Sequence, residues 1–219
     1  MISPHVVCIT DTICTRIAHN IWYNVHMDAE NERALYKIAE DQGGYFSLSQ
    51  ANAIGIRRNQ IYRAVKQSII ERVYHGVYRL VLFQANQFEE IYAAIVSMGD
   101  EAVVGFETAL YVYGLSDIIP ADIHIIMPRF SSRRRIHVKM HTTKLDDQDI
   151  TLYEGFRITT VARTIVDVLS SHSDIDQVHM AISQAIAQGM TTREKLIDQA
   201  QKRSKRILSQ IESLIKREV

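Results

Sequence analysis

Side chains with the chemistry needed to bind a nucleic acid are concentrated between positions 57 and 66. Arginine and lysine neutralise phosphates, and arginine, asparagine and glutamine can also pair with base edges through two hydrogen bonds. A surface that carries all of these types can both hold duplex DNA and discriminate among base sequences. The candidate contact residues of this segment are Arg57, Arg58, Asn59, Gln60, Tyr62, Arg63 and Lys66.

The pattern around this segment predicts three short helices. Apolar residues recur at helical spacing from Asn31 until two consecutive glycines end the first helix. Ser47 is a good N-cap for a second helix over about 48–54, after a short extended link. A third helix is predicted over about 58–67, and its solvent side carries most of the candidate contacts.

Two β-rich runs follow the third helix, over 69–74 and 77–80, and a Gly-bearing turn separates them. The order helix, helix, tight turn, helix, hairpin predicts a winged helix-turn-helix, whose third helix enters the major groove while the hairpin reaches the backbone or the minor groove. The alternative is a winged helix that contacts protein. The hairpin adds Arg72, His75 and Arg79 to the candidate DNA contacts.

Charge is strongly segregated along the chain, although 25 basic residues balance 25 acidic ones. Segment 55–80 carries six basic residues and one acid, whereas segment 86–128 carries seven acids and no lysine or arginine. The tail over 193–219 has eight basic and four acidic residues. Such a chain can present a basic face to phosphate while remaining neutral overall. A further nucleic-acid or partner contact, with a solvated loop as the alternative, is predicted at Arg129, Arg133, Arg134 and Arg135.

The composition is that of a globular protein with one or two domains, since 47% of its 219 residues are hydrophobic and 23% are charged. Cys8 and Cys14 are too few for a disulfide framework and favour a reducing cytoplasm. We find neither an apolar run long enough for a membrane span nor a signal peptide. A cytoplasmic protein with no membrane partner is therefore expected.

The expected fold class is α+β. A winged helix-turn-helix domain is predicted over 28–83, and a C-terminal α+β domain with a small sheet and several helices over 87–219. Three interpretations of residues 1–27 stay open: Met27 is the natural start, the segment is a loosely attached arm, or it forms an ordinary strand or helix that packs on the body. The expected C-terminal elements are helices over 87–98, 107–113 and 175–187 and from about 160, 192 and 204, strands over 123–127 and 136–141, and a hairpin over 150–158.

Two other pairs of residues have spacings with chemical meaning. His137 and His141 are four residues apart, as in a helical zinc pair, but the alternating pattern around them indicates a strand, where they would lie roughly 13 Å apart. Arg163 and Asp167 are four apart on a predicted helix, which favours a structural ion pair. No metal and no cofactor are therefore expected.

Several motifs recur along the chain in a characteristic order and spacing. They are Gln42–Ala51, Gly55-Ile56, Arg72–Leu80, Ala102–Leu110, Gly114–Asp117, Ile125–Arg129 and Thr159–Asp167. Over about residues 30–200 this pattern resembles the AbiEi antitoxin family. One departure is Gly105, where a serine or similar helix cap is expected, and the first 26 residues and the basic tail have no counterpart in this resemblance.

The resemblance implies an antitoxin of a bacterial type IV toxin–antitoxin pair. In that family the N-terminal domain binds operator DNA and represses its own operon, and the C-terminal domain counters a nucleotidyltransferase-like toxin without an assumed direct complex. The resemblance therefore implies double-stranded operator DNA as a partner, and the implied DNA contacts are the third-helix and wing residues named above.

The sequence also bears on two other classes of function. A stand-alone winged-helix transcriptional regulator with a ligand- or protein-sensing C-terminal domain fits the same pattern. A nuclease is disfavoured, because the sequence lacks the Glu-x-Lys triplet that would hold a divalent metal on a strand. It also lacks a phosphate-binding glycine-rich loop and a nucleophile elbow, so we do not expect an enzyme.

Overall fold

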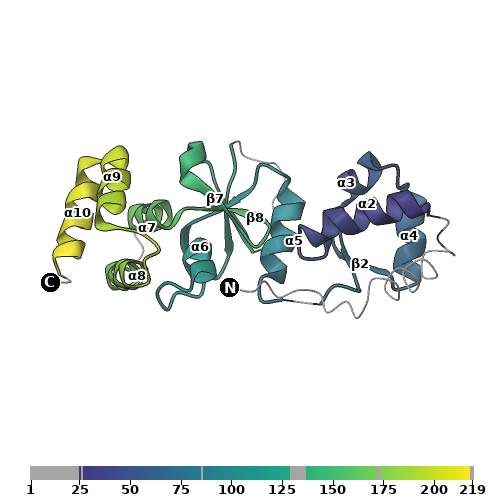
Figure 1. Ribbon diagram of the computed structural model, residues 1–219, viewed down its shortest axis with the longest axis horizontal. Helices are drawn as coiled ribbons and strands as arrows, with labels where there is room; N and C mark the ends of the chain where they lie inside the picture. Colours follow the sequence, from purple (N-terminus) through teal and green to yellow (C-terminus); the bar gives the residue numbers. More distant parts are fainter. Residues whose placement is uncertain (1–24, 26, 85, 129–136, 172–173, 218–219) are drawn as a thin grey trace. The chain divides into compact units, whose positions relative to one another are not determined.

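The computed structural model describes residues 25, 27–84, 86–128, 137–171 and 174–217 (Figure 1). Most of the N-terminal arm, both cysteines and the arginines at 129 and 133–135 lie outside these residues. The chain divides into two compact units, Met1–Ser97 and Met98–Val219. The sequence predicts a domain boundary at 84–86, whereas by its contacts the helix that follows this position belongs to the first unit.

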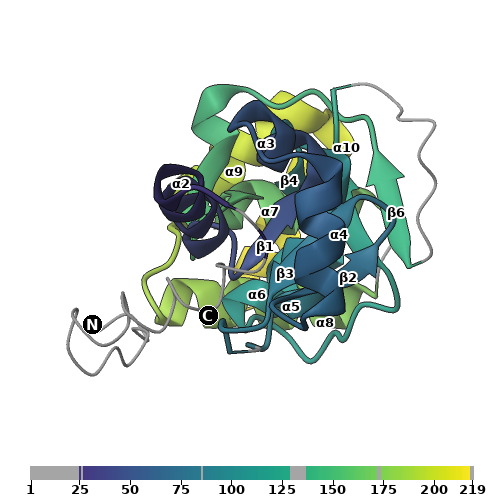
Figure 2. The same cartoon turned by 90° about the vertical axis from the view of Figure 1, so that its right-hand side faces the viewer.

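The first unit contains a bundle of short helices on a small antiparallel sheet (Figure 2). Its three strands lie in the order β1-β3-β2. The link expected over Tyr45-Phe46 is in fact a strand, because Phe46 pairs with Tyr78 in the hairpin. The elements are α2 (Ala29–Glu40), β1 (Tyr45–Ser47), α3 (Leu48–Ala53), α4 (Arg58–Lys66), β2 (Ile70–Tyr74), β3 (Val77–Leu80) and α5 (Glu89–Met98).

A capping box and a tight turn define the short helix α3. The Ser47 hydroxyl accepts a hydrogen bond from the Gln50 backbone N–H at 3.1 Å, and the Gln50 side chain accepts one from the Ser47 N–H at 2.8 Å. Gly55 then adopts a φ of +85°, a conformation that favours glycine, and turns the chain toward α4. Ile56 is fully buried directly after this turn, so it anchors the start of α4 to the core.

Helix α5 packs on the first unit through an aromatic contact. The ring of Tyr92 stacks on Tyr45, with 6.3 Å between ring centroids. It also covers Gly43, where a Cβ atom would lie 2.7 Å from the Tyr92 ring. Gly43 has a φ of +62°, a conformation that favours glycine. This position therefore requires glycine both for its backbone conformation and for the space that the Tyr92 ring occupies. These contacts explain why α5 groups with the other elements of the first unit.

The second unit is a mixed five-stranded sheet followed by four helices, which confirms the predicted α+β class. The strand order is β6-β5-β4-β8-β7, with parallel pairs β4/β8 and β5/β6 and antiparallel pairs β4/β5 and β7/β8. Figure 1 shows α7 to α10 gathered together beyond the sheet. The elements are β4 (Val103–Val104), α6 (Phe106–Tyr113), β5 (Ile123–Ile126), β6 (Val138–His141), β7 (Ile150–Tyr153), β8 (Phe156–Thr159), α7 (Val161–Ser170), α8 (Ile175–Ala187), α9 (Arg193–Arg203) and α10 (Lys205–Lys216).

The core of the second unit explains the glycine that departs from the expected motif. A Cβ atom at Gly105 would lie 2.7 Å from the Ile126 side chain, so the close approach of β5 leaves no space for serine. Behind this contact, apolar residues from α7 to α10 pack together, including Ile165, Ile182 and Ile211. None of the described helices is both long and apolar enough to span a bilayer.

Candidate nucleic-acid interface

Helix α4 is amphipathic and turns its polar side to solvent. Ile61 and Ala64 are buried against the sheet. The predicted contacts around them are exposed except for Gln60, and the Tyr62 side chain is 60% exposed. Positions three and four apart share one side of a helix. The exposed residues that fall on this side are Arg58, Asn59, Tyr62, Arg63 and Lys66.

Gln60 has a structural task at the start of the same helix. Its side-chain oxygen accepts a hydrogen bond from the Arg57 backbone N–H at 2.8 Å, and the residue is only partly exposed. An N–H of the first helical turn lacks a partner within the helix, so this bond stabilises the helix start. The side-chain oxygen of Gln60 is therefore already engaged in a hydrogen bond within the protein, which distinguishes Gln60 from its neighbour Asn59.

Tyr62 and Lys66 form a pair one turn apart on the exposed side of α4. The Lys66 Nζ atom lies 4.8 Å from the centre of the Tyr62 ring. A cation over an aromatic face at this distance is attracted by the ring quadrupole. The contact holds the Lys66 charge over the Tyr62 ring on the exposed side of α4.

The hairpin β2–β3 brings the wing residues to one end of the sheet. The Arg72 Nη2 atom lies 2.9 Å from His75 Nδ1, and both residues are exposed. The register between β2 and β3 shifts between Arg72 and Tyr74, which leaves a bulge before the turn. The Gly76 carbonyl accepts a hydrogen bond from the Leu48 N–H at 2.9 Å, so the wing tip is tied to the start of α3.

Arg79 differs from the other predicted wing contact. It is partly buried, and its Nε atom lies 2.5 Å from Glu71 Oε1 across the hairpin. Burial alone would lower the pKa of Arg79, but the hydrogen bond and charge of Glu71 outweigh it and raise that pKa. The charge of Arg79 is thus largely compensated within the protein.

The other cations of this surface are not paired in this way. Within the described residues, no carboxylate forms an ion pair with Arg57, Arg58, Arg63, Lys66 or Arg72. We call these five residues together with Asn59 and Tyr62 the α4–wing surface. It combines charge for phosphates with an amide and a phenol that can meet base edges. The predicted contacts at 129 and 133–135 lie outside the described residues.

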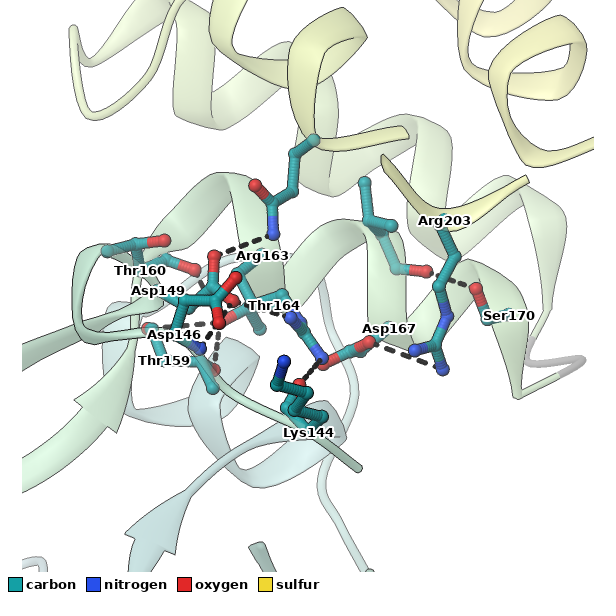
Figure 3. Close-up of polar contacts among 12 residues, drawn as sticks. Lys144, Asp146, Asp149, Thr159, Thr160, Arg163, Thr164, Asp167, Ser170 and Arg203 are labelled. Carbon is teal, nitrogen blue, oxygen red and sulfur yellow. Dashed lines mark hydrogen bonds and ion pairs between the residues drawn. The ribbon is translucent and has the colours of Figure 1, made fainter. Parts of the chain in front are cut away.

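The second unit contains a buried polar network around Arg163 (Figure 3). Its Nε atom donates to Asp167 Oδ2 at 2.7 Å, which is the ion pair expected from their spacing. Its Nη1 atom donates to Asp149 Oδ2 at 2.7 Å, and Asp149 also accepts from Gln199 at 2.9 Å. Asp149 and Gln199 were missed because they come from other elements. The network joins the segment before β7 to helices α7 and α9.

A histidine pair lies under helix α6 in the same unit. His124 Nδ1 is 2.6 Å from Glu107 Oε2, and the His141 ring stacks on Phe106 with 3.7 Å between centroids. Burial, together with the nearby His124, lowers the pKa of His141 to about 4. His137 and His141, the two histidines with the spacing of a helical zinc pair, do not lie on a helix, because His141 ends strand β6 and His137 precedes that strand. The described residues contain no group of three or more metal-ligating side chains suited to an ion.

Among the comparisons with known proteins, the match to a family model concerns the first unit. Residues 33–81 match a family model described as transcriptional regulator, AbiEi antitoxin. The fold is similar to the crystal structure of the RV2827C protein from Mycobacterium tuberculosis, with a TM-score of 0.53 and 11% identity, over 87% of this chain and 78% of that chain. No curated protein sequence matches the chain. The matched residues run from within α2 to the end of the β2–β3 hairpin and include α3 and α4, so the similarity to the AbiEi model covers the elements that carry the α4–wing surface.

Proposed function

We propose that this protein is a DNA-binding transcriptional repressor of the AbiEi antitoxin type. The observation that carries the proposal is the α4–wing surface, with its five exposed cations that no described carboxylate pairs. The family match over residues 33–81 supports the same reading. In this proposal α4 lies in the major groove of operator DNA, and the hairpin β2–β3 contacts the adjacent backbone.

Five residues of the α4–wing surface fall by their chemistry into two roles. Arg58, Asn59 and Arg63 carry planar groups that can form two hydrogen bonds to a base edge, so we assign sequence reading to them. Lys66 and Arg72 act as charges toward phosphates, which position the protein without reading sequence. His75 lies beside Arg72 at the wing tip and extends this backbone contact.

Binding of the full chain to DNA from upstream of its own gene tests the proposal. Fluorescence anisotropy at low salt should show binding, and Arg58→Ala/Arg63→Ala should weaken it by about 1–3 kcal/mol for each lost base contact. The matched control, Arg33→Ala/Lys37→Ala, removes the same charge from the exposed side of α2 and should retain most of the affinity. Equal losses in the two variants, or no binding by the wild type, would contradict the proposal.

We further propose that the second unit supplies the antitoxin activity against a nucleotidyltransferase-like toxin. Two observations support this: the motifs of the second unit resemble those of the family, and the second unit is a compact unit that does not include the α4–wing surface. If a nucleotidyltransferase-like gene lies beside the gene for this protein and the two activities lie in different units, Arg58→Ala/Arg63→Ala should abolish repression but still protect cells that express that gene. Loss of protection in that variant would contradict the assignment of the antitoxin activity to the second unit.

A further inference from the structure

Strand β7 forms one edge of the five-stranded sheet in the second unit. Alternate residues of an edge strand direct their backbone N–H and C=O groups toward the neighbouring strand and away from it. The Asp149 carbonyl accepts a hydrogen bond from the Thr160 N–H at 2.8 Å, so the odd-numbered residues of this stretch face β8, and Ile150 and Leu152 face outward. The Ile150 N–H already donates to the Asp147 carbonyl. Among the described residues of β7, Leu152 is therefore the one whose N–H and C=O both remain open to a further strand.

β7 has none of the features that usually keep an edge strand from pairing. Such strands are commonly interrupted by a bulge or carry charged residues or proline. The edge strand β2 has a bulge and two charged residues, and the edge strand β6 carries Lys139. β7 has the uncharged sequence Ile-Thr-Leu-Tyr, and its register with β8 is unbroken. A regular, uncharged edge of this kind is suited to accept another strand.

Leu152 also projects an apolar side chain from this edge. It is 72% exposed, more than any other large hydrophobic residue among those described except Ile119. An open hollow of about 250 Å³ lies beside it, and its walls include one acid and one base, so a second copy of this surface is not repelled by net charge. The residues that line the hollow are Asp147, Ile150, Thr151, Leu152 and Arg157.

A two-fold axis beside Leu152 satisfies the open backbone groups and the exposed side chain together. In an antiparallel pair of identical strands, a residue lies opposite its own copy only at the axis, and outward-facing residues at that position exchange two hydrogen bonds. The Leu152 N–H would donate to the Leu152 carbonyl of the second copy and its own carbonyl would accept in return. Residues that lie opposite each other share one side of the sheet, so each leucine would also pack at the hollow of the other copy.

We propose that this protein forms a homodimer in which two β7 strands pair across a two-fold axis at Leu152. The pairing joins two five-stranded sheets into one continuous sheet. A second copy fits this edge because Leu152 alone supplies the donor, the acceptor and the apolar side chain, so the surface complements itself. The contact is small, so we expect a dissociation constant of about 10–100 μM. This inference does not depend on the proposed DNA-binding function.

Sedimentation velocity of the full chain between about 5 and 500 μM tests for the dimer. Leu152→Lys should raise the dissociation constant by about tenfold or more, because it places two cations opposite each other on adjacent strands. The matched control is Ile119→Lys, which puts the same charge on a more exposed residue of the same unit and should leave the dissociation constant unchanged. A dimer that Leu152→Lys leaves unchanged would overturn the proposal. A wild type that stays monomeric throughout would overturn it too and would leave this edge to a strand of another protein.

Disulfide trapping tests the position of the axis. In full-length protein with Cys8→Ser and Cys14→Ser, Leu152→Cys should form an intermolecular disulfide on mild oxidation, since Cα atoms in a hydrogen-bonded antiparallel pair lie about 5.5 Å apart. Ile119→Cys is the control and should cross-link much more slowly, although Ile119 is the more exposed residue. Non-reducing electrophoresis measures both, and circular dichroism checks that each variant is folded. If Leu152→Cys cross-links no faster than Ile119→Cys, pairing at β7 is overturned.

Discussion

Glu71 and Arg79 face each other across the β2–β3 hairpin, and the Arg79 Nε atom lies 2.5 Å from Glu71 Oε1. Glu71 is the single acid between positions 55 and 80. The pair therefore compensates the charge of one predicted DNA contact, Arg79, whereas no described carboxylate forms an ion pair with the cations of α4 or with Arg72. The basic residues look equivalent in the sequence, but the structure separates Arg79, whose charge a carboxylate compensates, from those whose charge no described carboxylate compensates.

Arg79→Ala should weaken DNA binding much less than Arg63→Ala. The Arg79 charge is already offset by Glu71, whereas Arg63 is exposed and pairs with no described carboxylate, so its loss should cost about 1–3 kcal/mol if it reads a base. Anisotropy with the upstream duplex measures both. Glu71→Gln is the companion variant, and it should tighten binding because it frees Arg79. Equal losses from Arg63→Ala and Arg79→Ala would refute this division.

Asp167→Ala should destabilise the protein by about 3–5 kcal/mol, because it leaves the Arg163 guanidinium buried without one of its carboxylates. Burial raises the pKa of Asp167 although Arg163 opposes that shift. Urea unfolding followed by circular dichroism measures the loss. The companion variant Asp167→Asn keeps an oxygen that can accept the hydrogen bond from Arg163, so it should lose less stability than Asp167→Ala. A single variant as stable as the wild type would show that Arg163 gains no stability from this contact.

His141 should make the protein less stable as the pH falls. Its folded pKa of about 4 lies below the ordinary value of 6.5, so below about pH 6.5 the unfolded chain takes up a proton that the folded chain refuses. The groups around it are His124, Lys139 and Glu107. Its partial exposure reduces the effect, and we expect about 1 kcal/mol of stability to be lost between pH 7 and pH 5.

The comparison that isolates this effect is wild type against His141→Gln, with urea midpoints measured at both pH values. Glutamine does not titrate, so the variant should lose less stability on acidification than the wild type. Parallel losses in the two proteins would assign the pH dependence to other groups.

Gly55→Ala should destabilise the turn between α3 and α4 by about 1–2 kcal/mol, because alanine resists the left-handed conformation that Gly55 adopts at φ +85°. A Cβ atom there would make only an ordinary contact, 3.7 Å from Asn31, so the cost is conformational. Gly55→Asn should cost less, since asparagine tolerates this region. Thermal unfolding ranks the three proteins, and an alanine variant more stable than the asparagine variant would contradict the reason given.

A fragment over residues 25–97 should unfold cooperatively and resist more urea than one over 25–84. The longer fragment retains α5, whose Tyr92 covers Gly43 and stacks on Tyr45. Tyr92→Ala in the longer fragment should lower its midpoint toward that of the shorter one. Identical urea midpoints for the two fragments would contradict the assignment of α5 to the first unit and would favour the domain boundary at 84–86 that the sequence predicts.

Local sequence patterns were sufficient for most of the elements. The Ser47 cap and the apolar spacing after it predicted α3, and the bounds predicted for the helix over 175–187 agree with α8. These features depend on residues within one or two turns of each other. The strand β1 was missed because its three residues become a strand only through pairing with β3, about thirty residues further along the chain.

By itself the sequence determined the α+β class, the order of helices and hairpin, and the concentration of cations between Arg57 and Arg72, since all of these follow from short-range periodicity and residue chemistry. Only the tertiary structure decided that Gln60 caps α4, that Arg79 is neutralised by Glu71, and that Arg163 binds Asp149 as well as Asp167. The physical reason is that hydrogen bonds and ion pairs depend on distances of about 3 Å. Strand register and helix packing set those distances between residues that the sequence keeps apart.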